Sequence, residues 1–70
     1  MTDERRRWID SGWRTSKSNV HYDFKFVGGE QAGVNYRNGE YAGVWRGEWT
    51  VGFSHIDDAK SELYDLVRKR

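Results

Sequence analysis

Residues 21–53 alternate between apolar and polar side chains, and three pairs of turn-forming residues interrupt this alternation. The pairs are Gly28-Gly29, Asn38-Gly39 and Gly47-Glu48. Glycine and asparagine tolerate the positive φ of type I′ and II′ turns, so each pair fits a two-residue hairpin loop. The pattern therefore predicts an antiparallel β-meander of three to four strands.

Two-residue loops fix the pairing of neighbouring strands, so the side chains can be assigned to the two faces of the sheet. The first predicted face combines the large apolar side chains of Tyr22, Phe24, Phe26, Val44, Val51 and Phe53. Gly33 leaves room on this face between two bulky neighbours. The second predicted face carries Lys25, Ala32, Val34, Tyr36, Tyr41, Trp45 and Thr50.

Residues 54–70 predict an amphipathic helix. Ser54 is a suitable N-cap, acidic residues follow in the first turn, and the basic residues 68–70 close the segment, which matches the helix dipole. Apolar residues recur at intervals of three and four and form one stripe, made of Ile56, Ala59, Leu63, Leu66 and Val67. We expect this stripe to pack on the first face, which leaves the second face uncovered.

Residues 1–20 carry weaker signals. Thr2 as an N-cap and Gly12 as a stop are consistent with a short helix through Asp10 or Ser11, and the polar run at 15–19 predicts a loop. The predicted fold class is α+β, an antiparallel meander packed on one C-terminal helix. One domain is expected over residues 1–70, with an N-terminal helix and loop segment (1–20), the meander (21–53) and the C-terminal helix (54–70).

Composition narrows the classes of function. Eleven aromatic residues in 70 make an aromatic core, because so short a chain needs a large buried area per residue. Twelve basic and eleven acidic residues give a net charge of +1, without the basic excess that is usual in dedicated nucleic-acid binders. We expect a soluble, cytoplasmic protein, because no stretch resembles a signal peptide or a membrane span.

The sequence predicts no enzymatic activity. It has no cysteine, its two histidines lack the paired spacing of a zinc site, and no catalytic or phosphate-binding motif occurs. Asp57 and Asp58 beside His55 suggest acid–base chemistry, but acidic residues in a first helical turn are ordinary dipole partners. We therefore expect no catalytic residue, no metal, no cofactor and no small-molecule substrate.

The uncovered second face is the predicted binding surface, because contiguous aromatic patches on small domains usually have a partner. The predicted partner-binding residues are Lys25, Val34, Tyr36, Arg37, Tyr41, Trp45 and Thr50. Two other interpretations bury the same patch: the N-terminal segment folds back and covers it with Trp8, Ile9 and Trp13, or the chain self-associates through it.

The C-terminal half resembles a known group of DNA-binding domains. Val51-Gly52-Phe53 followed by a helix with Asp58-Ala59 and Tyr64-Asp65 is similar to the end of AP2-type domains and of integrase arm-binding domains. That resemblance implies a sheet backed by one helix, whose open face enters the DNA major groove. It implies a DNA-facing side made of Lys25, Tyr36, Tyr41, Trp45 and Thr50.

Two functional hypotheses follow. The first, which we favour, is a non-catalytic accessory protein that binds another protein through its aromatic sheet face; the short ββββα plan resembles bacteriophage accessory proteins in general character. The second is DNA binding through the same face, with possible phosphate contacts from Arg5, Arg6, Arg7 and Arg14. A protein partner or self-association is favoured over DNA, and no membrane partner is expected.

Overall fold

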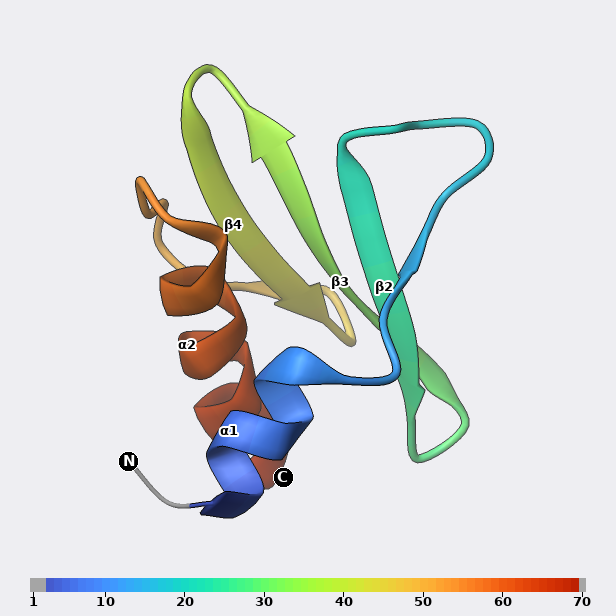
Figure 1. Ribbon diagram of the computed structural model, residues 1–70, viewed down its shortest axis with the longest axis vertical. Coiled ribbons are helices and arrows are strands. Elements are labelled where there is room, and N and C mark those ends of the chain that lie inside the picture. Colours follow the sequence, from blue (N-terminus) through green and yellow to red (C-terminus); the bar gives the residue numbers. More distant parts are fainter. Residues whose placement is uncertain (1–2, 70) are drawn as a thin grey trace.

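The computed structural model describes residues 3–69 and confirms the predicted α+β class. It contains one antiparallel sheet in the strand order β1-β2-β3-β4-β5, with a short helix before it and a longer helix after it (Figure 1). The elements in chain order are α1 (Asp3–Asp10), β1 (Arg14–Thr15), β2 (Tyr22–Val27), β3 (Glu30–Arg37), β4 (Glu40–Trp45), β5 (Glu48–Trp49) and α2 (Ile56–Arg68).

The first two predicted hairpin loops are confirmed. Val27 pairs with Glu30 around Gly28-Gly29, and Arg37 pairs with Glu40 around a loop whose Asn38 and Gly39 have φ values of 54° and 80°. Positive φ at both loop positions defines a type I′ turn, whose twist matches that of the flanking strands. The predicted pairing of β2, β3 and β4 is therefore the observed one.

The third predicted loop is wrong by one position along the chain. Trp45 pairs with Glu48, so the loop is Arg46-Gly47 rather than Gly47-Glu48, and both loop residues have positive φ. Arg46 adopts a positive φ although it is not a glycine. Its guanidinium is ion-paired with Glu30 and lies 4.4 Å from the centre of the Trp45 ring.

Phe53 lies on the face opposite to the predicted one, because an extra residue between Thr50 and Phe53 shifts the pairing with β4 by one position. The prediction placed Phe53 opposite Ala42, but Phe53 pairs with Tyr41. A slip of one residue inverts the direction of a strand side chain. Phe53 consequently faces the helix and packs against the buried core.

The prediction of which sheet face α2 covers is also wrong. The buried cluster consists of Ala32, Val34 and Trp45 from the sheet and Ala59 and Leu63 from α2. These sheet residues belong to the second predicted face. The predicted stripe on α2 is nevertheless the one that packs, with Ile56, Leu66 and Val67 at its margins.

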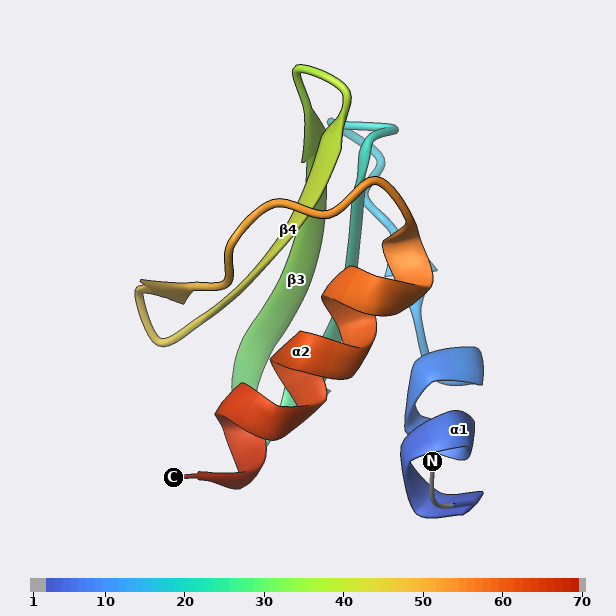
Figure 2. The same ribbon diagram turned by 90° about the vertical axis from the view of Figure 1, so that its left-hand side faces the viewer.

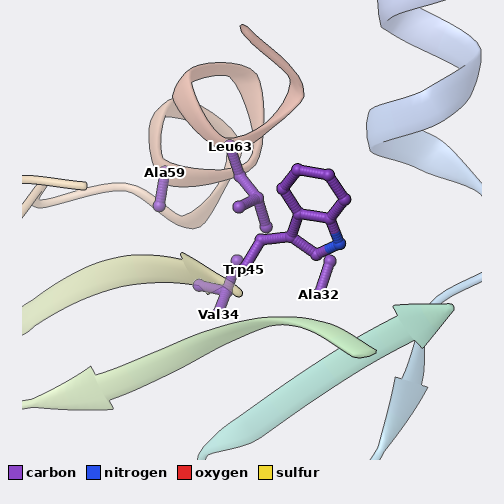
Figure 3. Packing of buried hydrophobic residues seen from close by; sticks show 5 residues of the cluster. All are labelled: Ala32, Val34, Trp45, Ala59 and Leu63. Carbon is purple, nitrogen blue, oxygen red and sulfur yellow. The ribbon is translucent and has the colours of Figure 1, made fainter. Parts of the chain in front are cut away.

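The small side chains of the second face explain this choice. Gly43 lies opposite Val34 in the sheet, and a Cβ added to it would lie only 3.0 Å from the Cβ of Leu63. Figure 3 shows Leu63 and Ala59 directed from α2 toward Val34, with the Trp45 indole beside Leu63 and Ala32. A glycine and an alanine let the helix approach closely enough for Leu63 and Trp45 to fill the space between the layers.

The N-terminal segment packs on the same side of the sheet, as one of the alternative interpretations expected. In both views α1 lies beside α2, and α2 runs along β4 and β3 (Figures 1 and 2). Ile9 is buried, and Trp8 and Trp13 pack against the core cluster. Within residues 3–69 both helices thus lie over one face, and we call the other face, which carries Tyr22, Phe24, Phe26, Val44 and Trp49, the open face.

Polar contacts tie α1 to α2. Arg5 donates a hydrogen bond of 2.6 Å to Asp65, and Glu4 accepts hydrogen bonds from the Tyr64 hydroxyl and from Arg68. The Arg5 guanidinium beside Asp65 holds the pKa of that carboxyl below its ordinary value. The ion pair between Arg5 and Asp65 therefore stabilises the docked α1 only while the Asp65 carboxylate stays ionised.

The predicted N-cap of the C-terminal helix is not observed, whereas α1 ends at Asp10, before the predicted stop at Gly12. His55, not Ser54, is the N-cap of α2, and no side chain accepts a hydrogen bond there. The proposed cap Thr2 and the terminal Arg70 lie outside the described residues. The predicted loop at 15–19 is correct apart from Thr15, which forms β1 with Arg14 and pairs with Asp23.

We expect Trp45→Phe to be tolerated far better than Trp45→Ala. The indole is 4 % exposed, and its Nε1–H has no hydrogen-bond acceptor among the described residues. Alanine would leave a large cavity and cost about 3–5 kcal/mol. Phenylalanine removes the unsatisfied donor, and this gain offsets part of the cost of the lost volume. We therefore expect Trp45→Phe to lower the free energy of unfolding by about 1 kcal/mol or less. Urea unfolding of both variants, followed by circular dichroism, measures the difference; equal losses would contradict this account of the core.

We expect the stability of the protein to fall below about pH 4, and Asp65→Asn to weaken this dependence. The folded-state pKa of Asp65 is lowered, first by the hydrogen bond from Arg5, so its contribution is present above the unfolded-state pKa. That contribution is lost as pH falls through the lowered folded-state pKa.

Melting temperatures between pH 2 and pH 7 test this expectation. Asp58→Asn is the matched control, because Asp58 is exposed and its side chain forms no ion pair within residues 3–69. An identical pH dependence for Asp65→Asn and the wild type would show that the link between α1 and α2 contributes nothing.

Candidate functional site

Two of the predicted partner-binding residues belong to the core. Val34 and Trp45 are 1 % and 4 % exposed, because α2 covers the face that was expected to be open. A buried side chain cannot contact a partner without unfolding of the domain. The structure therefore corrects their assignment as binding residues.

Lys25 is also used inside the fold. Its Nζ donates a hydrogen bond of 2.6 Å to the Trp8 carbonyl and lies 4.3 and 4.9 Å from the ring centres of Trp8 and Trp13. Burial, and to a lesser extent the charge of Lys60, lowers the pKa of Lys25. Cation–π contacts of this kind stabilise folded structure, so Lys25 attaches α1 to the sheet.

The other predicted binding residues are spread over separate places. Tyr36 and Tyr41 stack at 4.6 Å on the helix-covered side, at the end of the sheet, where they stay partly exposed. The Thr50 hydroxyl accepts a hydrogen bond from the Gly43 amide and thereby joins β4 to the segment after β5. Arg37 is exposed at the end of β3.

The predicted phosphate-contacting arginines divide into two pairs. Arg5 binds Asp65, and Arg6 binds both Asp10 and Asp57, so these two arginines hold the helices together. Arg7 and Arg14 are exposed and form no ion pair within residues 3–69. Arg14 lies opposite Phe24 in the sheet, which places it on the open face.

A ladder of aromatic side chains crosses the open face along β2. Tyr22, Phe24 and Phe26 alternate with residues of the other face, and each ring centre is 6.1 Å from the next. The Tyr22 ring lies over Gly33, where any side chain would collide with it. Burial of this ring raises the pKa of the Tyr22 hydroxyl. Phe26 ends the ladder and is 68 % exposed.

Trp49 extends the aromatic surface to the far edge of the sheet. It pairs with Val44 across β4 and β5 and is 57 % exposed. By register, the charged residues of the open face are Arg14, Arg37 and Glu40. The acidic residues Asp10, Asp57 and Asp65 bind arginines in the helical layer. The open face thus combines aromatic rings with a small excess of positive charge, although the whole chain is almost neutral.

The described residues form no metal-binding cluster. No three histidine or carboxylate side chains of residues 3–69 come close enough to hold a metal ion. In the same part of the chain, neither helix has the length and apolar character to cross a membrane. The open face can bind flat or apolar groups, but it brings together no nucleophile and base.

Comparison with family models, with curated proteins and with solved structures finds no match. The resemblance to AP2-type and integrase arm-binding domains stays a prediction. The site must therefore be interpreted from its own geometry.

Sequence reasoning found the aromatic ladder but placed it in the core. The alternation of Tyr22, Phe24 and Phe26 is visible in the sequence, as is the apolar character of the face they share. Small residues alone gave no signal, because β3 and β4 place Ala32 and Gly43 on one face and Gly33 and Ala42 on the other. The difference is that the Tyr22 ring of β2 lies over Gly33, whereas the space over Gly43 is open to Leu63.

We expect Gly33→Ala to displace Tyr22 from the ladder. The new methyl group must push the ring toward solvent, at a cost of about 1 kcal/mol, because the ring lies on a partly exposed face. Release from its buried position should move the pKa of the Tyr22 hydroxyl back toward its ordinary value. A spectrophotometric titration, with Tyr22→Phe variants of both proteins to isolate the Tyr22 signal, measures the change; an unaltered titration would place the ring elsewhere.

Proposed function

We propose that this protein is a non-catalytic module that binds single-stranded nucleic acid on its open sheet face. The observation that carries the proposal is the ladder on the open face, which is partly exposed at Tyr22 and Phe24 and 68 % exposed at Phe26. Arg14 lies on the neighbouring strand. Proteins that bind single strands combine aromatic rings, on which successive bases stack, with basic side chains along the path of the backbone.

The geometry of the ladder suits an extended strand. Rings at alternate positions of one β-strand repeat at about 6.6 Å, because each residue rises about 3.3 Å. The stacking partners are thus arranged in a line, and every base has a face that can stack on them. A double helix keeps its bases paired and stacked on each other. The ladder therefore favours unpaired nucleotides over the DNA duplex that the resemblance to AP2-type domains implied.

The positions of the charges agree with this proposal. Arg14 is beside the middle of the ladder, and Arg7 lines a shallow pocket together with Phe26 at its end. Both arginines are free of ion pairs with residues 3–69. Only a few phosphate contacts are available, so affinity is expected to be moderate and to depend on stacking as much as on charge.

A protein partner on the same face is the second candidate, and it is the function favoured by the sequence. The observation in its favour is an exposed aliphatic residue directly after β5, since Val51 is 72 % exposed. Aliphatic side chains do not stack on bases, but they are ordinary components of protein interfaces. A bacteriophage-type accessory role would belong with this candidate.

We expect Phe26→Ala and Trp49→Ala to weaken binding to oligothymidylate of about 12 nucleotides by about 1–3 kcal/mol each. Both side chains are more than half exposed, so the variants should remain folded. Tyr36→Ala is the matched control, because this exposed ring lies on the helix-covered side. Fluorescence anisotropy of a labelled oligonucleotide gives the affinities, and equal affinity of all four proteins would refute the site.

Salt dependence separates the two candidates. Each phosphate contact with a single strand contributes about −0.7 to the slope of log K against log salt concentration. Arg14→Gln should make the slope shallower by about 0.7, whereas Lys69→Gln, at the end of α2, should leave it unchanged. No binding to oligothymidylate or oligouridylate at low salt would leave the protein-binding candidate as the better one.

A further inference from the structure

A second feature of the open face is a pocket at the end formed by the β3–β4 hairpin. Its walls are Asn35 and Arg37 of β3, Glu40 of β4 and Trp49 of β5. Its lining is completed by Asn38 of the hairpin loop and by two residues with little or no side chain, Ala42 and Gly52. A side chain at position 52 would collide with the Glu40 carboxylate, so this glycine makes the room that the carboxylate occupies.

The polar groups of this pocket are not used by the fold. The side chains of Asn35, Arg37 and Glu40 form no hydrogen bond or ion pair with residues 3–69. Arg37 and Glu40 do not bind each other, although they are directly opposite across the two strands. By contrast, Glu30 and Arg46, at the opposite end of β3 and β4, do form an ion pair. A pocket with one aromatic wall and several unused polar groups is typical of a ligand site.

The chemistry of the walls selects a planar ligand with hydrogen-bond donors along one edge. The Trp49 ring offers a flat face for stacking, and the Glu40 carboxylate can accept two parallel hydrogen bonds. Guanine is the base that carries two adjacent donors, N1–H and the N2 amino group, and a carboxylate matches this pair. The Asn35 amide can donate to a base acceptor, and the Arg37 guanidinium can bind a phosphate.

We propose that this pocket binds a guanine base, which gives the protein a preference for guanine within single-stranded nucleic acid. The preference rests on the proposed function, whereas the pocket itself can be tested with a free nucleotide. Binding then has two parts: the ladder on β2 holds successive bases without regard to sequence, and the pocket beside Trp49 distinguishes one base from the others.

The test compares oligothymidylate with the same oligonucleotide carrying one central guanine, and with a third carrying hypoxanthine at that position. Guanine should tighten binding by about tenfold, since a good bidentate contact discriminates by about that factor or more. Hypoxanthine lacks the 2-amino group and should lose most of the gain. The corresponding oligouridylates show whether the ribose or deoxyribose form is preferred.

Glu40→Gln is the decisive variant. It keeps the size of the side chain but removes the charge and the paired acceptors, so the guanine preference should disappear while affinity for oligothymidylate stays within about twofold of wild type. Glu62→Gln is the control, because Glu62 is an exposed residue of α2. Equal affinity of the wild type for the guanine and thymine oligonucleotides would overturn the pocket and leave the proposed function standing.

If neither oligonucleotide binds, the proposed function fails and the pocket is tested alone. Guanosine monophosphate is then titrated into the protein and followed by nuclear magnetic resonance. Shifts of the Asn35 side-chain amide and the Trp49 indole N–H that are absent in Glu40→Gln would support a guanine site. The absence of such shifts in the wild type at millimolar nucleotide would overturn it.

Discussion

The close approach of α2 to β4 is the contact on which the rest of the structure depends. Gly43 has no side chain, so Leu63 can lie against the strand, and Trp45 then fills the space beside it. Close packing in protein interiors makes such a fit selective, because a helix held away by one methyl group loses contacts along its length. Once α2 is in place, Trp8, Ile9 and Trp13 complete the same layer.

The same contact leaves the open face of the sheet without a helix. A chain of this size normally needs each of its large apolar side chains for stability. Phe26 and Trp49 are nevertheless more than half exposed, whereas the core is formed around Val34, Trp45 and Leu63. Exposed rings that alternate along a strand, with an arginine beside them, are the physical basis of the proposed function. In this proposal, stability and binding use opposite faces of one sheet.

The charged side chains are also divided between the helical layer and the open face. Arg5 and Arg6 hold α1 against α2 through carboxylates, and Lys25 lies between two tryptophan rings. These groups give the helical layer its polar links and leave it close to neutral. Arg14 and Arg37 remain on the open face. The overall charge of the chain therefore says little about the charge of the surface that would meet a ligand.

Local signals in the sequence determined much of the fold. Gly28-Gly29 and Asn38-Gly39 accept positive φ, so these two loops and the pairing of β2, β3 and β4 could be predicted. The apolar stripe around Ala59 and Leu63 was visible from its spacing alone. The third loop was missed because Arg46 adopts a conformation that its residue type does not indicate. Phe53 was placed on the wrong face because the pairing shifts by one position between Thr50 and Phe53, which no sequence signal indicates.

The choice between the two sheet faces was decided only by tertiary structure. Both faces carry aromatic side chains, and the hydrophobic effect depends on buried area without specifying which face is buried. The decision came from shape, because Tyr22 fills the space over Gly33 on the open face whereas Gly43 leaves room for Leu63 of α2. The candidate site follows from that decision. The sequence determined which side chains share a face, and the packing of α2 determined which face remained free to bind.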